Sequence, residues 1–318
     1  MGEKQIGTGS FADAFVAPGV GRNDRLDRIE ELFDWSHFKK ILKPLRSSQG
    51  RKGYPSLSMF KALLLQQWYS LSDPGLEDAL LDRLSFRRFC GFSLDDATPD
   101  ETTFVRFRTA LSERGLAEKA FNEVARQLDT QGLILRIGTL IDASLVAASV
   151  AKPVGPKGSL STLDPDAAWT KQYGRSTFGY KAHIAVDQFS CLIRKVEMTP
   201  ANIYESLVAD NLILGDEKAV YADKGYEHKE RRKRLKAQGI KDRIMHRSHK
   251  YQDGLPHWQQ VCNRLIIPLR ASVEKLFGTM KRSYAYSRVR YVGLQRNTNH
   301  LHLLCIAMNM RRAEVLTP

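Results

Sequence analysis

TLIDASLVAA, at residues 139–148, is the stretch around which the fold of this chain is organised, and VYADKGY, at residues 220–226, is its counterpart. Each is a run of apolar, β-forming residues interrupted by one aspartate, Asp142 in the first and Asp223 in the second. A charge inside a buried strand is costly unless it is paired or bound to a metal. On two central strands of one sheet, the carboxylates would lie side by side and could share hard divalent cations. The simpler alternative is that each aspartate marks a strand end and faces water.

The segments around these two strands alternate between strand and helix patterns. FGYKAHIAVD (178–187) and CLIRKVEMTP (191–200) predict a strand pair joined by a short turn. The other segments predict helices at 201–214, 227–240, 263–281 and 297–313 and a short strand at 242–247. This order is typical of an α/β layer, in which a mixed sheet is flanked by helices. We expect it to form one domain over residues 131–318.

The preceding residues, 28–130, predict an all-helical domain. Its last helix is expected to start near Thr98, as the cap, and to end at Gly115. That helix carries Arg106 and Arg108. Short helices with basic side chains on the last one resemble a helix-turn-helix DNA-binding module, and a plain helical bundle is an equally good interpretation.

Two segments predict little regular structure. Residues 1–27 are small and polar, which favours a loose leader. Residues 151–176 are rich in Gly, Pro, Ser and Lys, which favours a flexible loop.

Composition narrows the class of protein. The chain has 318 residues, 42% of them hydrophobic, and a net charge of +14. The excess of positive charge favours a polyanionic partner. We find no apolar run long enough to span a membrane and no signal peptide, so a cytoplasmic protein is expected. The four cysteines form no CxxC pair, and the eight histidines form no HExxH or zinc-finger spacing, so reduced thiols and no zinc site are expected.

A third acid of interest, Glu274, lies in IPLRASVEKLFGTMKRS at residues 267–283. In a helix, Arg270, Glu274 and Lys281 lie within about 40° of one stripe. Such a helix can present one carboxylate for a metal site between two cations for DNA phosphates. The alternative is a surface helix with an Arg–Glu pair, which contributes little to stability.

Basic residues gather around these acids. Between Arg270 and Arg296 there are seven Lys and Arg residues and a single acid, Glu274. Aromatic residues are interspersed among them, a mixture that suits phosphate contact and base stacking. The residues that we predict to contact DNA are Arg270, Lys281, Lys224, Arg282, Arg288, Arg290, Tyr291, Arg106 and Arg108.

At these positions the chain resembles the DDE transposases of bacterial insertion sequences, most closely the insertion-sequence-five family. The resemblance covers residues 30–313. It is carried by the C-terminal signature, by TLIDASLVAA and VYADKGY around the two aspartates, by FGYKAHIAVD followed by TPAN, and by SLSDPGLEDALLDRLSFRRFCGF with TPDETTF. The signature residues are Arg270, Glu274, Lys281, Tyr284, Arg290, Tyr291 and Gly293. Two positions depart from the family pattern: Ile267 stands where a Tyr is common, and Tyr204-Glu205 where a His-Asp pair is common.

The resemblance implies a ribonuclease H-like core with Asp142, Asp223 and Glu274 as catalytic, metal-binding triad. It implies two Mg²⁺ ions, replaceable by Mn²⁺, that serve cleavage of the element ends and transfer of the 3′-OH to target DNA. Asp142 would bridge both ions, and Arg270 and Lys281 would hold phosphates. The expected partners are double-stranded DNA, as terminal inverted repeats and target, and a second copy of the chain in a homodimer or larger assembly. No nucleotide cofactor is expected, since GxxxxGK[ST] is absent.

Three other functions remain open at this point. A ribonuclease H-like nuclease would cleave DNA without strand transfer. A domesticated, non-catalytic DNA-binding protein would bind without cleavage, although all three acids are retained. A basic RNA-binding protein is the weakest alternative, because the chain has no recognisable RNA-binding module.

Overall fold

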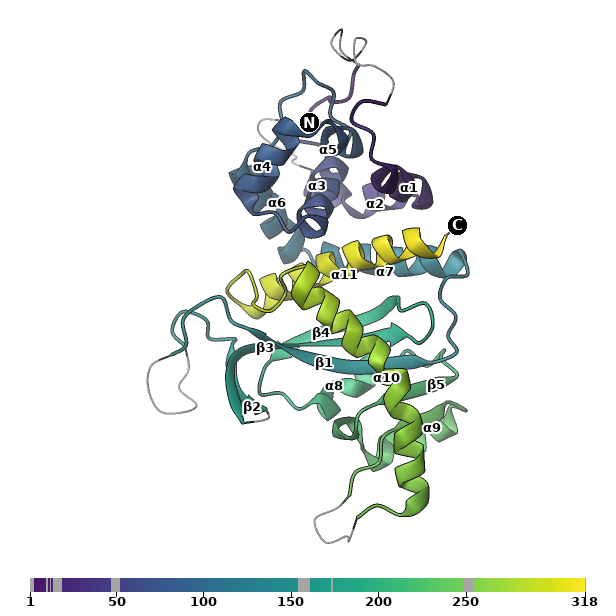
Figure 1. Ribbon diagram of the computed structural model, residues 1–318. Helices are drawn as coiled ribbons and strands as arrows, with labels where there is room; N and C mark the ends of the chain where they lie inside the picture. Colours follow the sequence, from purple (N-terminus) through teal and green to yellow (C-terminus); the bar gives the residue numbers. More distant parts are fainter. Residues whose placement is uncertain are drawn as a thin grey trace. The chain divides into compact units, whose positions relative to one another are not determined.

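The computed structural model describes residues 3–9, 11, 13, 19–46, 52–153, 161–172, 174–248 and 254–317. The chain divides into two compact units (Figure 1), which we describe separately: Met1–Thr130 together with His302–Pro318, and Gln131–Leu301. The first break falls after Thr130. The second differs from the expected domain 131–318, because residues from 302 on pack with the N-terminal helices. The indole Nε1 of Trp68, for example, donates to the carbonyl of Ala307 at 2.7 Å.

The N-terminal unit is helical, as the sequence predicts. Its helices are α1 (Asp24–Leu32), α2 (Trp35–Ile41), η2 (Lys43–Leu45), α3 (Ser56–Trp68), α4 (Asp73–Asp82), α5 (Leu84–Cys90), α6 (Glu101–Glu113), α7 (Leu116–Thr130) and the last part of α11 (Leu294–Leu316). Helix α5 ends at Cys90 and is followed by Gly91, which takes the left-handed conformation (φ 78°) that glycine adopts without strain. Helix α6 is capped by Asp100 and not by Thr98, because the Asp100 carboxylate accepts the N–H of Thr103 at 2.6 Å.

Described residues of the expected leader are hydrogen-bonded to this unit. The backbone N–H of Gly7 donates to the carboxylate of Asp96 at 2.8 Å, and that of Ser56 donates to Glu3 at 2.9 Å. Helix α1 already starts at Asp24, within the expected leader. Side chains can thus anchor a polar segment that has no apolar periodicity of its own.

The second unit is built on one mixed sheet. In the described part of the chain it has six strands: β1 (Thr139–Ala147), β2 (Ala168–Gln172), β3 (Arg175–Asp187), β4 (Ile193–Pro200), β5 (Ala219–Ala222) and β6 (Lys241–Ile244). Strand β3 pairs antiparallel with β1 on one side and with β4 on the other, whereas β5 pairs parallel with β1 and β6 parallel with β5. This order, β4-β3-β1-β5-β6, is the ribonuclease H-like arrangement, so the predicted fold class is confirmed.

Helices cover the sheet (Figure 1): α8 (Glu205–Leu212) contacts β3, β4 and β1, and α10 (His257–Ser283) contacts β1, β5 and β6. Helix α9 (Lys229–Ala237) packs on β6. Ile141 of β1 lies in a buried cluster with Val208 and Leu212 of α8 and Leu235 of α9. Because successive strand residues point to opposite faces, the next residue of β1, Asp142, faces away from that cluster.

Two segments are more regular than their sequence indicates. Strand β2 lies within residues 151–176, where a flexible loop is expected; residues 154–160 and 173 of that loop lie outside the described residues. Helix α10 starts at His257, several residues before the expected start, and contains Pro268. None of the helices in the described residues has the length and apolar character needed to cross a membrane.

Candidate active site

The two aspartates meet because their strands are adjacent and parallel. Thr139 pairs with Val220 and Leu140 with Tyr221 in the register of β1 and β5. Two residues further along both strands, the same register brings Asp142 alongside Asp223, on the same face of the sheet. Asp223 directly follows β5 and caps the short helix η3 (Lys224–Tyr226), since its carboxylate accepts the N–H of Lys224 at 2.6 Å.

A buried arginine joins the two carboxylates. Arg270 Nη2 lies 3.3 Å from Asp142 Oδ2, and Arg270 Nη1 lies 3.8 Å from Asp223 Oδ1. The arginine comes from the core-facing stripe of α10, whose buried residues are Ile266, Arg270, Val273, Phe277 and Met280. A cation thus occupies one position of an otherwise apolar stripe, and it is directed at two anions on the sheet. The site therefore contains two carboxylates facing one cationic group.

Burial controls the ionisation of Asp142, whose side chain is 17% exposed. Desolvation raises its pKa to about 6, and the negative charges of Glu205 and Asp223 act in the same direction. The guanidinium of Arg270 and the N–H of Ala143, which donates to Oδ1 at 2.9 Å, oppose this shift. The raised pKa means that burial, helped by the two neighbouring acids, outweighs the stabilisation that Arg270 and the Ala143 N–H give to the ionised carboxylate.

Two further residues belong to the site and were not predicted. The hydroxyl of Tyr226 is fully buried and has no hydrogen-bond partner among the described residues, and desolvation and the charge of Glu205 raise its pKa. Glu205 starts α8 and lies 3.5 Å from Lys181 Nζ. The sequence signals are an acid just after the turn that follows β4 and an aromatic residue three positions after Asp223.

Glu274 is not brought to the two aspartates. Glu274 is the residue after Val273, which belongs to the core-facing stripe, and the side chain of Glu274 is exposed. Among the residues that the structure describes, no three acidic, His or Cys side chains stand close enough together to hold a metal ion. The sequence placed Arg270, Glu274 and Lys281 on one stripe. In the structure the apolar stripe turns Arg270 inward and leaves Glu274 and Lys281 exposed.

The family models match nearly the whole chain. A transposase domain, DUF772, matches residues 17–110, and the transposase DDE domain matches residues 135–310. This chain belongs to the DDE transposases.

Two solved structures are similar to this transposase. One is a cryo-electron microscopy structure of a piggyBac transposase synaptic complex with hairpin DNA, with 10% identity and a TM-score of 0.41, covering 91% of this chain and 76% of that one. The other is the crystal structure of the Mos1 strand transfer complex, with 11% identity and a TM-score of 0.19, covering 86% of this chain and 84% of that one.

Membership of the DDE family implies that the transposase depends on a divalent metal ion. The donor set fits such an ion in part. Asp142 and Asp223 offer oxygen ligands from neighbouring strands, and the cationic Arg270 that they flank shows that a positive charge is accommodated between them. Glu274 would have to supply the third carboxylate from a position outside this cluster.

The predicted DNA-contacting residues of the transposase fall into three groups. Lys224, Lys281, Arg282, Arg288 and Arg106 are exposed and available to phosphates. Arg290 and Tyr291 are half-buried, and the Tyr291 backbone is engaged by the side chains of Asn297 and Ser149. Arg270 and Arg108 are buried.

Arg108 requires a correction. Its guanidinium binds the carboxylate of Asp73 through two contacts, at 2.9 and 2.7 Å, and also donates to Gln66 at 3.1 Å. It occupies the core-facing stripe of α6 between Phe104 and Leu111. A buried arginine with its fork filled by a carboxylate is a structural ion pair, so we remove Arg108 from the set of DNA-contacting residues.

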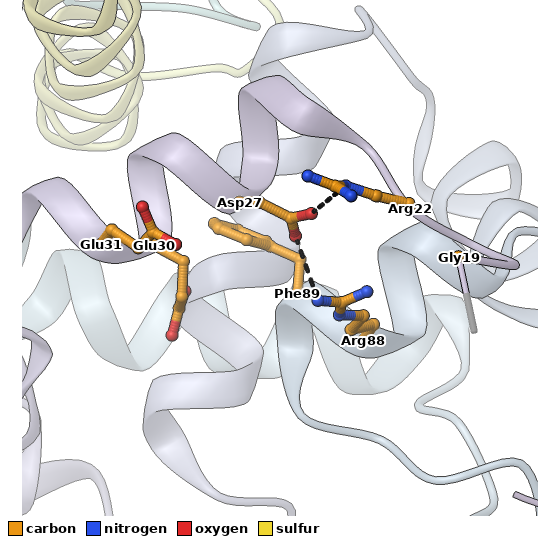
Figure 2. Close-up of a pocket in the computed structure, with 7 residues that line it drawn as sticks. All are labelled: Gly19, Arg22, Asp27, Glu30, Glu31, Arg88 and Phe89. Carbon is orange, nitrogen blue, oxygen red and sulfur yellow. Dashed lines mark ion pairs between the residues drawn. The ribbon is translucent and has the colours of Figure 1, made fainter.

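A surface pocket of about 400 Å³ in the N-terminal unit is a poor DNA site (Figure 2). The acids Asp27, Glu30 and Glu31 line it, against Arg22 and Arg88. Asp27 forms ion pairs with both arginines: its Oδ2 lies 3.9 Å from Arg22 Nε, and its Oδ1 lies 3.7 Å from Arg88 Nη2. Glu30 is paired in turn with Lys61 at 2.6 Å, so the described cations at this pocket are already engaged by carboxylates and are poorly placed to take a phosphate.

Proposed function

We propose that this transposase cleaves the ends of an insertion sequence and joins the freed 3′-OH to target DNA, with Asp142, Asp223 and Glu274 as the metal-binding carboxylates. The observation that carries the proposal is the pair of aspartates on adjacent parallel strands of the DDE domain, both within 4 Å of one buried cationic group. Mg²⁺ is the proposed ion, with Mn²⁺ able to replace it, and two ions per site are proposed.

Glu274 is proposed as the third ligand from its place on α10. It lies four residues after Arg270, which is slightly more than one helical turn, or about 6 Å along the axis. The exposed side chain has room to take a new rotamer. We propose that Glu274 becomes a ligand only when the metal is bound, after its side chain has changed conformation.

The residues of the site divide the chemistry among them. Asp142, Asp223 and Glu274 would hold the divalent ions, which would supply activation of the attacking oxygen and stabilisation of the departing one. Asp142, with a pKa of about 6, is largely ionised at neutral pH and available as a ligand. The exposed Lys281, Lys224, Arg282 and Arg288 attract and hold the phosphates on either side of the reacting bond.

The division of labour along the chain is also proposed. The helical N-terminal domain, with the exposed Arg106, recognises the terminal inverted repeats, and the α/β unit performs the chemistry. A dimer or larger assembly on DNA is proposed because two element ends must be joined. Membership of the insertion-sequence-five family is supported by the spacing of Arg270, Glu274 and Lys281, although Ile267 departs from its pattern.

A cleavage and strand-transfer assay tests the proposal. Labelled element ends, intact or pre-cleaved, are incubated with target DNA and Mg²⁺ or Mn²⁺. Asp142→Asn, Asp223→Asn and Glu274→Gln should each reduce both reactions at least about a hundredfold, while binding of the ends persists. Glu230→Gln, the same change at an exposed acid of α9, is the matched control and should react normally.

The outcomes separate the alternatives. Cleavage without joining of pre-cleaved ends would indicate a nuclease, and binding without either reaction would indicate a domesticated DNA-binding protein. Normal reaction by Glu274→Gln alone would remove Glu274 from the site and leave the two aspartates in it.

A further inference from the structure

Arg270 is the one cation that contacts both aspartates among the residues described. It stands on the buried stripe of α10, and its side chain is 10% exposed. The three groups together carry one positive and two negative charges, so the guanidinium neutralises the two carboxylates only in part. Its removal would leave two like charges beside each other, on side chains that are 17% exposed at Asp142 and 36% exposed at Asp223.

The guanidinium is held loosely for a buried group. Its distances of 3.3 and 3.8 Å to the two carboxylates exceed the 2.7–2.9 Å or so of a charge-assisted hydrogen bond. In the part of the chain that the structure describes, its Nε is buried without a hydrogen-bond partner, and its Nη1 also lies 3.9 Å from the sulfur of Met245, a weak acceptor. Few strong contacts therefore oppose its departure from the carboxylates.

We infer that Arg270 is an exchangeable counter-ion, which a divalent cation must displace from between Asp142 and Asp223. The inference rests on the proposed function, since it takes these aspartates as metal ligands. A metal ion binds carboxylate oxygens at about 2.0–2.2 Å. A guanidinium within 4 Å of both carboxylates occupies the space that a shared ion needs, and the two cations would repel each other at such short range.

DNA gives the displaced arginine a new partner. A guanidinium binds phosphate through two parallel hydrogen bonds, which replace the carboxylate contacts that it loses. When Arg270 binds a phosphate, it leaves the two aspartates available to the metal ion. When the metal ion binds the aspartates, Arg270 becomes available to bind a phosphate. Metal and DNA then bind with positive coupling, and by linkage each raises the affinity for the other by the same factor.

Mn²⁺ binding followed by electron paramagnetic resonance tests the exchange on the full chain without DNA. Arg270→Gln should bind Mn²⁺ at least about tenfold more tightly than wild type, within the usual 5–150-fold range of couplings. Arg264→Gln is the matched control, because Arg264 is an exposed arginine on the same helix and loses the same charge; its affinity should stay within about twofold of wild type. Equal or weaker binding by Arg270→Gln than by Arg264→Gln would overturn the inference.

The same titration separates this inference from the proposed function. Asp142→Asn should lose the Mn²⁺ signal of the site. If wild type and Asp142→Asn bind Mn²⁺ equally, the proposed metal site fails. If Asp142→Asn loses binding while Arg270→Gln gains none, only the exchange fails.

A second titration in the presence of a duplex with an element end measures the coupling. The duplex should raise the Mn²⁺ affinity of wild type and of Arg264→Gln about fivefold or more, and that of Arg270→Gln less than about twofold. An equal rise in all three would contradict the role of Arg270. If Arg270→Gln does not fold, Arg270→Lys serves instead, with Arg264→Lys as control. The lysine contacts one carboxylate at a time and should raise the Mn²⁺ affinity about threefold; no rise over Arg264→Lys would overturn the inference.

Discussion

The two units each contain a buried arginine facing aspartate, and the two clusters differ in how well the charges are satisfied. In the N-terminal unit, Arg108 holds Asp73 at 2.9 and 2.7 Å and also contacts Gln66. In the α/β unit, Arg270 is shared between Asp142 and Asp223 at 3.3 and 3.8 Å. The first cluster has one acid for one arginine and short contacts, and the second has two acids and long ones.

This difference in charge balance distinguishes a structural ion pair from a ligand-binding site. The N-terminal cluster is complete within the chain, so its role is to join α6 to α4. In the second cluster two carboxylates share one guanidinium at longer distances, and burial raises the pKa of Asp142 in spite of that cation. A group that is poorly stabilised in the folded protein is one that a ligand can stabilise, and perturbed carboxylates are typical of functional sites.

The largest effect is expected where the satisfied pair is broken. Arg108→Ala leaves the Asp73 carboxylate partly buried without its cation, which should reduce the free energy of unfolding by about 3–5 kcal/mol. Arg106→Ala, an exposed arginine on the same helix, should change it by less than about 0.5 kcal/mol. Denaturant unfolding followed by circular dichroism measures both, and equal effects would mean that the pair is not structural.

The same substitution should act with opposite sign in the two clusters. Burial raises the pKa of Asp142 from an ordinary value near 4 to about 6, so the stability that this group contributes is lost as the pH rises through that window. At pH 8 Asp142→Asn should therefore raise the free energy of unfolding by about 1–3 kcal/mol, whereas Asp73→Asn should lower it. Destabilisation by both variants would show that Arg270 satisfies its aspartates as fully as Arg108 does.

His183 of β3 offers a buried titratable group outside both clusters. Desolvation, with the charge of Lys181, lowers its pKa to about 3, and it is bonded to Thr199 Oγ1 at 3.0 Å. The unfolded chain takes up a proton near pH 6.5 and the folded chain does not, so stability should fall by about 1.4 kcal/mol for each pH unit below 6.5. His183→Gln should have a smaller slope between pH 7 and pH 5; an unchanged slope would place the titration elsewhere.

The smallest effect concerns the exposed cations of α10. Lys281→Gln removes one proposed phosphate contact and should reduce the slope of log affinity for DNA against log salt by about 0.9. Lys275, an exposed lysine on another side of the same helix, is the matched control, and Lys275→Gln should leave the slope unchanged. Equal slopes for both variants would contradict a specific role for Lys281.

The sequence predicts the fold well because periodicity reports which residues are buried. It predicts the hairpin of β3 and β4, the strands that carry the two aspartates, and the helical N-terminal half. It does not give the parallel register of β1 and β5, which depends on long-range packing. It also missed β2, whose residues Ala168–Gln172 form a strand by pairing with β3 and have little β pattern of their own.

The arginines show what a closer interpretation of the sequence could have found. Arg108 lies between Phe104 and Leu111, and Arg270 between Ile266 and Val273, so each takes the same place in an apolar stripe. Apolar residues with this spacing pack against the core, and the arginine between them is buried as well. The pattern predicts a buried arginine in each helix, although only coordinates show which acids receive it.

Diffraction from crystals of the protein with a duplex element end and Mn²⁺, with anomalous differences recorded near the manganese edge, tests the central claim most directly. We predict a peak about 2.1 Å from oxygens of both Asp142 and Asp223, with the Arg270 guanidinium moved away from them. A peak bound by other residues, in crystals whose protein is active in strand transfer, would contradict the account.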